Sequence, residues 1–170
     1  MEYLVPKPRN VVLDSHRLKA LFLLDLGTGL RQGELLGLKW SDIDMINSEL
    51  HIKRSLKQVS IISADGTRKR KTIEQIPKTK GSLRTVPIPN KLINILKVHR
   101  SIQKQERLKA GSSYKISEFV FTTELGTTID AKNLTMQYSR LLTKAKIQYR
   151  KFHSLSYPNL NKIQTFFKYA

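Results

Sequence analysis

Arg31 is the first candidate for a functional residue, because of its charge and its surroundings. It lies within "TGLRQGELLGLKWSDID", residues 28–44, where most of its neighbours are apolar or small. A guanidinium that is mostly buried is costly unless an anionic group completes it. We therefore expect Arg31 to meet an anion, and the alternative is a pairing within an amphipathic helix, with Glu34 or Asp42.

A strongly basic stretch covers residues 66–84. It holds seven cationic side chains against a single acid, Glu74. The seven are Arg68, Lys69, Arg70, Lys71, Lys78, Lys80 and Arg84. Residues 131–170 add eight basic side chains and no acid. Two such regions would suit a surface that follows phosphates, and the alternative is that they are solvated faces.

The histidines lie far apart in the chain. His153 follows Arg150 and Lys151 in a tail without acidic side chains, so taken alone it is a residue of a basic tail. His99 falls on the apolar face of a predicted helix, which favours a place in the core or at its rim. Four scattered histidines and no cysteine give no metal-ligand spacing, and we expect neither a metal site nor a cofactor.

Two helices are predicted in the first part of the chain. The first runs from an N-cap at Asp14 or Ser15 to Gly27 or Gly29. Its apolar positions, close to helical spacing, are Leu18, Leu21, Phe22 and Leu26. The second helix covers residues 31–40 and turns its leucines inward. These are Leu35, Leu36 and Leu38.

A small antiparallel sheet is predicted next. In residues 49–56, "ELHIKRSL", the side chains of Leu50, Ile52 and Leu56 fall on one side at even spacing, which is the pattern of a half-buried strand. Between residues 58 and 88 the β-rich pieces "QVSII", "KTIEQI" and "RTVPI" alternate with the turns "ADGT" and "TKGS". These pieces predict a sheet of about three strands.

The last part of the chain is predicted to be mainly helical. Pro89 and Asn90 open a long helix. Its apolar face holds Leu92, Ile95, Leu96, His99 and Ile102. A short strand, "EFVFTT", precedes a final helix with the apolar face Ala131, Leu134, Tyr138, Leu141, Leu142 and Ala145. The order of elements predicts an α+β domain that is mostly helical, with a small antiparallel three-stranded sheet.

Composition favours one basic domain. The chain has 170 residues, enough for one sizeable core, and a formal net charge of +18 at pH 7. Such a charge attracts polyanions, so nucleic acid leads as partner, ahead of an anionic membrane surface. The sequence shows no signal peptide and no stretch near the roughly 20 apolar residues of a membrane span, so we expect a soluble, cytoplasmic protein.

The stretch around Arg31 resembles the first signature box of the tyrosine recombinases, the phage-integrase family. The resemblance spans residues 28–44 without a gap, and it implies that Arg31 binds the scissile phosphate while Glu34 holds the local structure. "PKTKGSLRTVPIP" is similar to the family's lysine hairpin and the strand after it. This implies that Lys78, or Lys80 if the loop length differs, is the general acid to the leaving 5′ oxygen.

Two boxes near the end of the chain resemble the family only in part. "HSLSY" is similar to the third box, with His153 in place, but Ser156 stands where the family has its second arginine. "NKIQT" and the tyrosine after it resemble the last box, which makes Tyr169 the nucleophile and puts Leu160 in the place of a histidine. In this family the tyrosine attacks a DNA phosphodiester to give a 3′-phosphotyrosine link without ATP or metal. Loss of one arginine weakens the stabilisation of the transferring phosphoryl group.

The resemblance also implies a domain layout and a function. Residues 1–13 form a leader, residues 14–155 a partial catalytic domain, and residues 156–170 an atypical tail that arose by deletion or by a frameshift near codon 155. A complete enzyme would be longer at both ends.

The function implied is that of a site-specific recombinase or integrase that is incomplete. Double-stranded DNA is its expected partner, bound through the basic residues of 66–84. When bound to DNA, the protein would be associated with the nucleoid. The alternative is a non-catalytic DNA-binding remnant, whereas a basic RNA-binding domain would leave the box around Arg31 unexplained. Related enzymes form homo-oligomers on DNA by exchanging carboxy-terminal segments, so a homo-oligomer on DNA is also open here.

Overall fold

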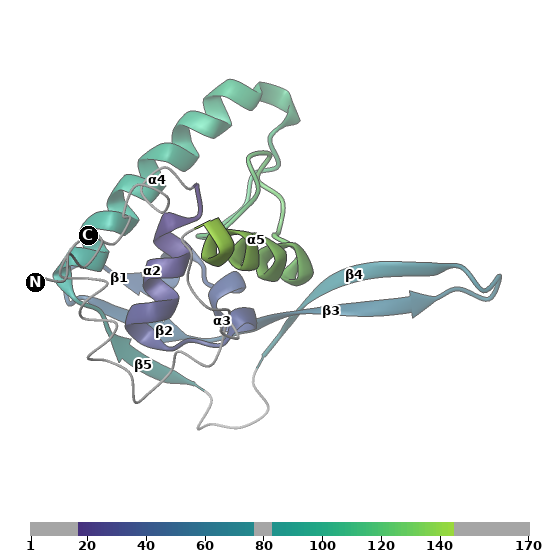
Figure 1. The fold of residues 1–170 in the computed structure, drawn as a ribbon, viewed down its shortest axis with the longest axis horizontal. Helices are drawn as coiled ribbons and strands as arrows, with labels where there is room; N and C mark the ends of the chain where they lie inside the picture. The colour runs from purple at the N-terminus through teal and green to yellow at the C-terminus, as the bar shows by residue number, and fades with distance from the viewer. Residues whose placement is uncertain (1–16, 77–82, 145–170) are drawn as a thin grey trace, which may run out of the picture.

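The described part of the chain combines helices with short strands. The structure, a computed structural model, describes residues 17–76 and 83–144 (Figure 1). Its elements are α2 (Lys19–Thr28), α3 (Gln32–Leu36), η1 (Trp40–Asp42), β1 (Ile43–Asp44), β2 (Glu49–Ile52), β3 (Ser55–Ile62), β4 (Arg68–Gln75), β5 (Arg84–Pro87), α4 (Asn90–Ala110), η3 (Gly111–Ser113) and α5 (Ala131–Lys144). Within these ranges no helix has the length and apolar character needed to span a bilayer.

Several predicted features lie outside the described residues. They are the leader up to residue 13, the cap candidates Asp14 and Ser15, the hairpin lysines Lys78 and Lys80, and the tail with His153, Ser156 and Tyr169. The assignment of these residues therefore stays a prediction.

Helix α2 lies inside the core. All residues from Ala20 to Asp25 are buried, because α2 is covered on every side instead of presenting one face to water. It ends at Gly29, one of the two predicted positions, where a left-handed φ of 62° lets the Gly29 N–H donate to the Asp25 carbonyl oxygen at 2.8 Å. Helix α4 packs against α2, and Tyr138 of α5 meets Phe22 of α2 with ring centroids 5.7 Å apart.

The three-stranded antiparallel sheet exists, but its strands are not the three predicted pieces. Its order is β1-β2-β5, with Leu50 opposite Val86. The strand predicted over residues 49–56 breaks at Lys53 and Arg54 into β2 and β3, which belong to different sheets. The predicted apolar positions of these strands are nevertheless buried: Leu50, Ile52 and Leu56.

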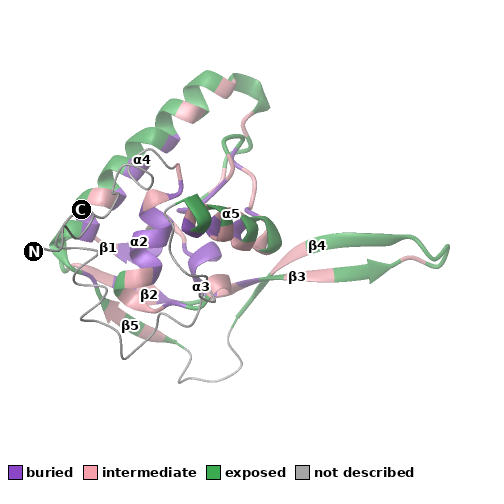
Figure 2. Cartoon of the chain, in the orientation of Figure 1, coloured by how far each residue is buried: buried purple, intermediate pink, exposed green. Residues whose placement is uncertain are grey.

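Strands β3 and β4 form a separate two-stranded hairpin, here called the arm, which projects from the body (Figure 1). It is inserted between β2 and β5, two neighbours in the three-stranded sheet. Leu56 anchors its base in the core, whereas its outer half is exposed on both strands (Figure 2). The predicted turn "ADGT" lies at its tip, with Gly66 at a φ of 78°.

Helix α4 begins after Pro89, as predicted, but its buried face differs slightly from the predicted one. Leu92, Leu96 and His99 are buried as expected, and Gln103 replaces Ile102, which is 38% exposed. Gln103 can be buried although it is polar, because both its amide oxygen and its amide nitrogen form hydrogen bonds.

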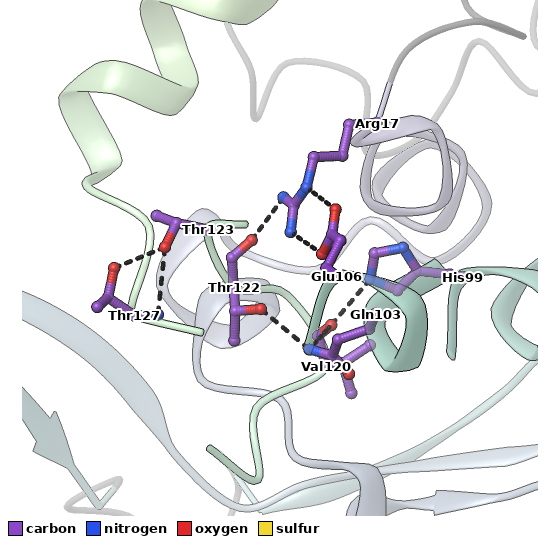
Figure 3. Close-up of polar contacts among 8 residues, drawn as sticks. All are labelled: Arg17, His99, Gln103, Glu106, Val120, Thr122, Thr123 and Thr127. Carbon is purple, nitrogen blue, oxygen red and sulfur yellow. Dashed lines mark hydrogen bonds and ion pairs between the residues drawn. The ribbon is translucent and has the colours of Figure 1, made fainter. Parts of the chain in front are cut away.

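The strand predicted for "EFVFTT" is not a strand: residues 118–123 make only isolated bridges, such as that of Phe119 with Lys39. Side chains of α4 hold the segment instead (Figure 3). Gln103 Nε2 donates to the carbonyl oxygen of Phe119 at 3.2 Å and to Thr122 Oγ1 at 3.0 Å. His99 Nε2 lies 2.9 Å from the Val120 carbonyl oxygen, so His99 has the core role that its position predicted.

Candidate functional site

Arg31 lies at the N-cap of α3, directly after the turn that ends α2. Its side chain is 75% exposed, so the burial expected from its apolar neighbours does not occur. The backbone N–H of Arg31 donates to Glu34 Oε2 at 2.8 Å, and its Nη1 lies 3.5 Å from Glu34 Oε1. Glu34 therefore holds the backbone of Arg31 and lies near one end of its guanidinium, while most of the side chain faces solvent.

Gly33 allows α3 to lie close to the start of β3. A Cβ on Gly33 would lie 2.8 Å from the Leu56 carbonyl oxygen, closer than side-chain carbons approach backbone oxygens. The first glycine of "RQGELLG" therefore reflects packing of the helix that presents Arg31.

Glu34 connects Arg31 to the sheet. Its carboxylate accepts two hydrogen bonds from Arg84 of β5, at 3.0 Å from Nη1 and 2.8 Å from Nη2. Its side chain is only 7% exposed. Burial by itself would raise the pKa of Glu34, but the hydrogen bonds from Arg84 and from the Arg31 backbone outweigh it and hold that pKa below the usual value. Glu34 is therefore an ionised bridge between α3 and β5, which goes beyond the local role implied by the resemblance.

Arg84 thus has a partner inside the protein, although the sequence predicts a DNA contact for it. A bidentate guanidinium–carboxylate pair fixes both groups in one plane. β5 directly follows the segment that holds Lys78 and Lys80, so the pair ties the strand after the predicted lysine to the helix that starts at Arg31.

The start of α5 meets both α3 and the arm. Gln32 Nε2 donates to the Ala131 carbonyl oxygen at 2.9 Å and lies 3.1 Å from Thr135 Oγ1. Gln58 of the arm donates to the carboxylate of Asp130, and this hydrogen bond is the main cause that lowers the pKa of Asp130. The beginnings of α3 and α5 and the base of the arm are therefore held together by side-chain amides.

The outward side of α5 belongs to the second basic region of the sequence, residues 131–170. It carries Lys132, Met136 and Arg140, which are exposed and four residues apart. The same four-residue spacing in the sequence could have identified this face.

A network of ion pairs holds the base of the arm. Lys39 Nζ lies 3.4 Å from Glu74 Oε2 and 3.3 Å from Glu118 Oε2. Arg54 pairs with the buried Asp42 and lies 3.6 Å from the same Glu74 oxygen. The only acid of the basic stretch is therefore used at the base of the arm.

The outer part of β4 presents its cations to solvent. Arg68, Lys69, Arg70 and Lys71 are all exposed, and no carboxylate of the described residues forms an ion pair with them. Among residues 17–76 and 83–144, no group of histidines and acids could hold a metal ion. The chemistry available here is therefore the binding of anions by cations.

Comparison with known proteins gives one consistent result. The model of the phage integrase family matches residues 4–156. The "Tyrosine recombinase XerC-like" protein of Caldanaerobacter subterraneus subsp. tengcongensis is 59% identical over 154 residues, which are 89% of this chain and 39% of that protein. The ICEBs1 integrase of Bacillus subtilis is 31% identical over 103 residues, 61% of this chain and 26% of that protein. The chain thus spans well under half the length of these relatives.

Solved structures share the fold. The Tn1549 transposon integrase, solved with a circular intermediate DNA, superposes with a TM-score of 0.62 at 19% identity, over 89% of this chain and 49% of that one. XerA recombinase gives a TM-score of 0.58 at 19% identity, over 91% and 47% of the two chains. The fold is that of the catalytic domain of tyrosine recombinases, as the box around Arg31 predicted. The chain belongs to the phage integrase family.

Proposed function

We propose that this chain is the DNA-binding catalytic domain of a site-specific tyrosine recombinase or integrase in which Ser156 impairs strand cleavage. One observation carries the proposal: Arg31 extends a side chain that is 75% exposed from a helix start held by Glu34 and Arg84. A fixed backbone and a solvent-exposed cationic side chain suit Arg31 to bind a phosphate of another molecule. The relatives' names and the DNA complex of the Tn1549 integrase support the same substrate.

Each proposed catalytic residue has a separate role. Arg31 binds the non-bridging oxygens of the scissile phosphate, where negative charge increases during transfer. Lys78, with Lys80 as the alternative, protonates the leaving 5′ oxygen. His153 supports the same phosphate, and Tyr169 takes the position of the family's nucleophile, the tyrosine that forms the 3′-phosphotyrosine link.

Ser156 favours a second candidate function, a DNA-binding protein that does not cut. It occupies the position at which the family has its second arginine, and a serine cannot neutralise a phosphate charge. Such a protein would occupy recombination sites on double-stranded DNA, either alone or as a homo-oligomer.

The two functions differ in covalent chemistry. Because of Ser156, we expect no more DNA-linked protein from this chain than from its Tyr169→Phe variant when both are mixed with a pool of nicked suicide duplexes. The measurement is a denaturing gel with labelled DNA. A stable adduct that depends on Tyr169 would show that the domain cuts DNA despite Ser156, and Arg31→Ala in the same assay would then test the role of Arg31.

The arm should provide much of the affinity for DNA. Replacing Arg68, Lys69, Arg70 and Lys71 by glutamine should reduce the slope of log affinity against log salt by about 0.9 for each phosphate that the arm no longer neutralises. Fluorescence anisotropy with a random duplex at several salt concentrations measures the slope.

A control must remove the same charge from another place. Four exposed cations of α4 serve: Lys97, Lys104, Arg107 and Lys109. Their replacement by glutamine should change the slope much less than the arm variant does. Equal reductions in the two variants would show that net charge, and not the arm, determines DNA binding.

A further inference from the structure

Helix α4 carries a stripe of cations on one flank. Lys97, Arg100, Lys104 and Arg107 follow each other at intervals of three and four residues, so they point in similar directions. The opposite flank faces α2, where Ile95, Val98 and Ile102 line a groove shared with Lys19 and Ala20. The stripe therefore lies on the side of α4 that is turned away from α2.

No acid of α4 interrupts this stripe. The one acidic residue of the helix, Glu106, points elsewhere and forms a bidentate pair with Arg17, with Nη2 2.7 Å from Oε2 (Figure 3). Among the described residues no carboxylate forms an ion pair with Arg100, Lys104 or Arg107. Their charge is available to a partner.

The stripe borders a small concave groove with an aromatic wall. Its volume is about 100 Å³, and its lining consists of Trp40, Arg100, Gln103, Lys104, Arg107, Tyr114, Ile116 and Ser117. Trp40 is held in place because its Nε1 donates to Gln103 Oε1 at 2.8 Å. The Arg100 guanidinium lies 5.0 Å from the centre of the Trp40 ring, a cation–π contact.

Large apolar side chains are exposed beside these cations. Ile116 is 77% exposed and Leu108 is 82% exposed. A surface that combines aromatic, arginine and apolar side chains has the composition of protein-binding sites. We propose that this groove, which we call the α4 groove, binds a segment of another protein that is rich in Asp and Glu and carries at least one apolar side chain.

The geometry favours a protein segment over DNA. A phosphate backbone would pair with the cations but would leave Ile116 and Leu108 without apolar contacts. The volume of the α4 groove equals that of a few water molecules, which suits one side chain and not a duplex. The α4 groove shares no residue with Arg31, Glu34, Arg84 or the arm, so this proposal is independent of the proposed function.

The chain offers a direct probe, because Trp40 is its one tryptophan. Titration with the peptide EELEELE, which has no aromatic residue, should change the tryptophan emission in a saturable way. The peptide EEEEEEE should bind several-fold more weakly, because it lacks the apolar side chain. Replacement of Arg100, which contacts the Trp40 ring, will itself change the tryptophan emission. In such variants the affinity is measured by the fluorescence anisotropy of labelled EELEELE.

Matched variants locate the binding. Replacing Arg100, Lys104 and Arg107 by glutamine should weaken EELEELE binding at least tenfold, whereas replacing Lys57, Lys69 and Lys71 of the arm should leave it within about twofold. Equal effects of the two triple variants would overturn the proposal, because net charge alone would then explain the binding. A saturable change of emission with a random duplex but not with EELEELE would also overturn it and would identify the α4 groove as a DNA surface.

Discussion

Replacing Asp25 by asparagine should stabilise the protein, and the gain should grow as the pH rises from 4 to 8. Asp25 lies in α2, is 3% exposed, and its Oδ2 has no hydrogen-bond partner among the described residues. Burial raises the pKa of Asp25 from 3.8 to about 8. The carboxyl group is therefore protonated in the folded state at neutral pH, when an unfolded chain would have it ionised.

The sign of the effect follows from proton linkage. Between pH 3.8 and about 8 the folded state binds one proton more at Asp25 than the unfolded state does, so this residue lowers stability as the pH rises through that window. At 1.4 kcal/mol for each pKa unit, the full shift corresponds to a cost of up to about 5 kcal/mol at pH 8. Asparagine has a similar shape and does not ionise, so it removes the pH-dependent part of this cost.

Urea unfolding of both proteins at pH 5, 6.5 and 8 measures the difference. We expect Asp25→Asn to gain at least about 2 kcal/mol between pH 5 and pH 8 relative to the unchanged protein. Glu124→Gln is the matched control, since Glu124 is an exposed acid, and it should leave the pH profile as it is. If the profiles of the Asp25→Asn variant and the unchanged protein run parallel, Asp25 is ionised in the folded state and the argument from its burial is wrong.

Replacing Arg84 by methionine should lower the free energy of unfolding by about 2 kcal/mol at pH 7. The substitution leaves the buried carboxylate of Glu34 without its bidentate partner, and a buried charge without compensation is costly. Replacing both residues, as Glu34→Gln with Arg84→Met, should cost clearly less than the sum of the two single changes. Urea unfolding of the four proteins completes the double-mutant cycle.

The pH dependence of the cycle adds a second test. The pKa of Glu34 is held below its ordinary value of 4.5, so its ionised form contributes stability above that value, which is lost as the pH falls through the folded-state pKa. In Arg84→Met, burial dominates and raises the pKa of Glu34, so the penalty should shrink when the pH is lowered from 7 to 4. Arg68→Met, which removes an exposed cation of the arm, should cost little at either pH.

The same variant separates the two roles of Arg84. If Arg84 contacts DNA, as the sequence predicts, Arg84→Met should reduce the salt slope of DNA binding by about 0.9. If its role is the Glu34 bridge, the slope should stay the same while stability falls.

Helices could be predicted from the sequence better than strand partners. The end of the first helix, predicted at Gly27 or Gly29, and the opening of α4 at Pro89 depend on local residue chemistry, and the structure confirms an end at Gly29 and the start after Pro89. Pairing of β2 with β5 depends on contacts across more than thirty residues, which alternating side chains do not specify. The segment of residues 118–123 resembles a strand because it is rich in aromatic and β-branched residues, but side chains of α4 bind its backbone.

The residues of the candidate site could be predicted from their types, but the contacts between them could not. Arg31 and the cations of β4 are exposed, so an anion can reach them. The bridge from Glu34 to Arg84 joins two boxes that are fifty residues apart, and no local pattern encodes it. The exposure of Arg31 was also missed, because the apolar neighbours that suggested burial point into the core from the other side of α3.

The arm is inserted at a point where the chain closes on itself. Ile52 and Arg84 face each other as partners in adjacent strands, so the two ends of the insertion are already side by side. Each doubling of the length of a loop between such ends adds only about 0.6 kcal/mol to the cost of closing it. The arm can therefore grow or shrink by pairs of residues in evolution without moving β2 or β5, and its reach can be adapted separately from the site that Glu34 holds together.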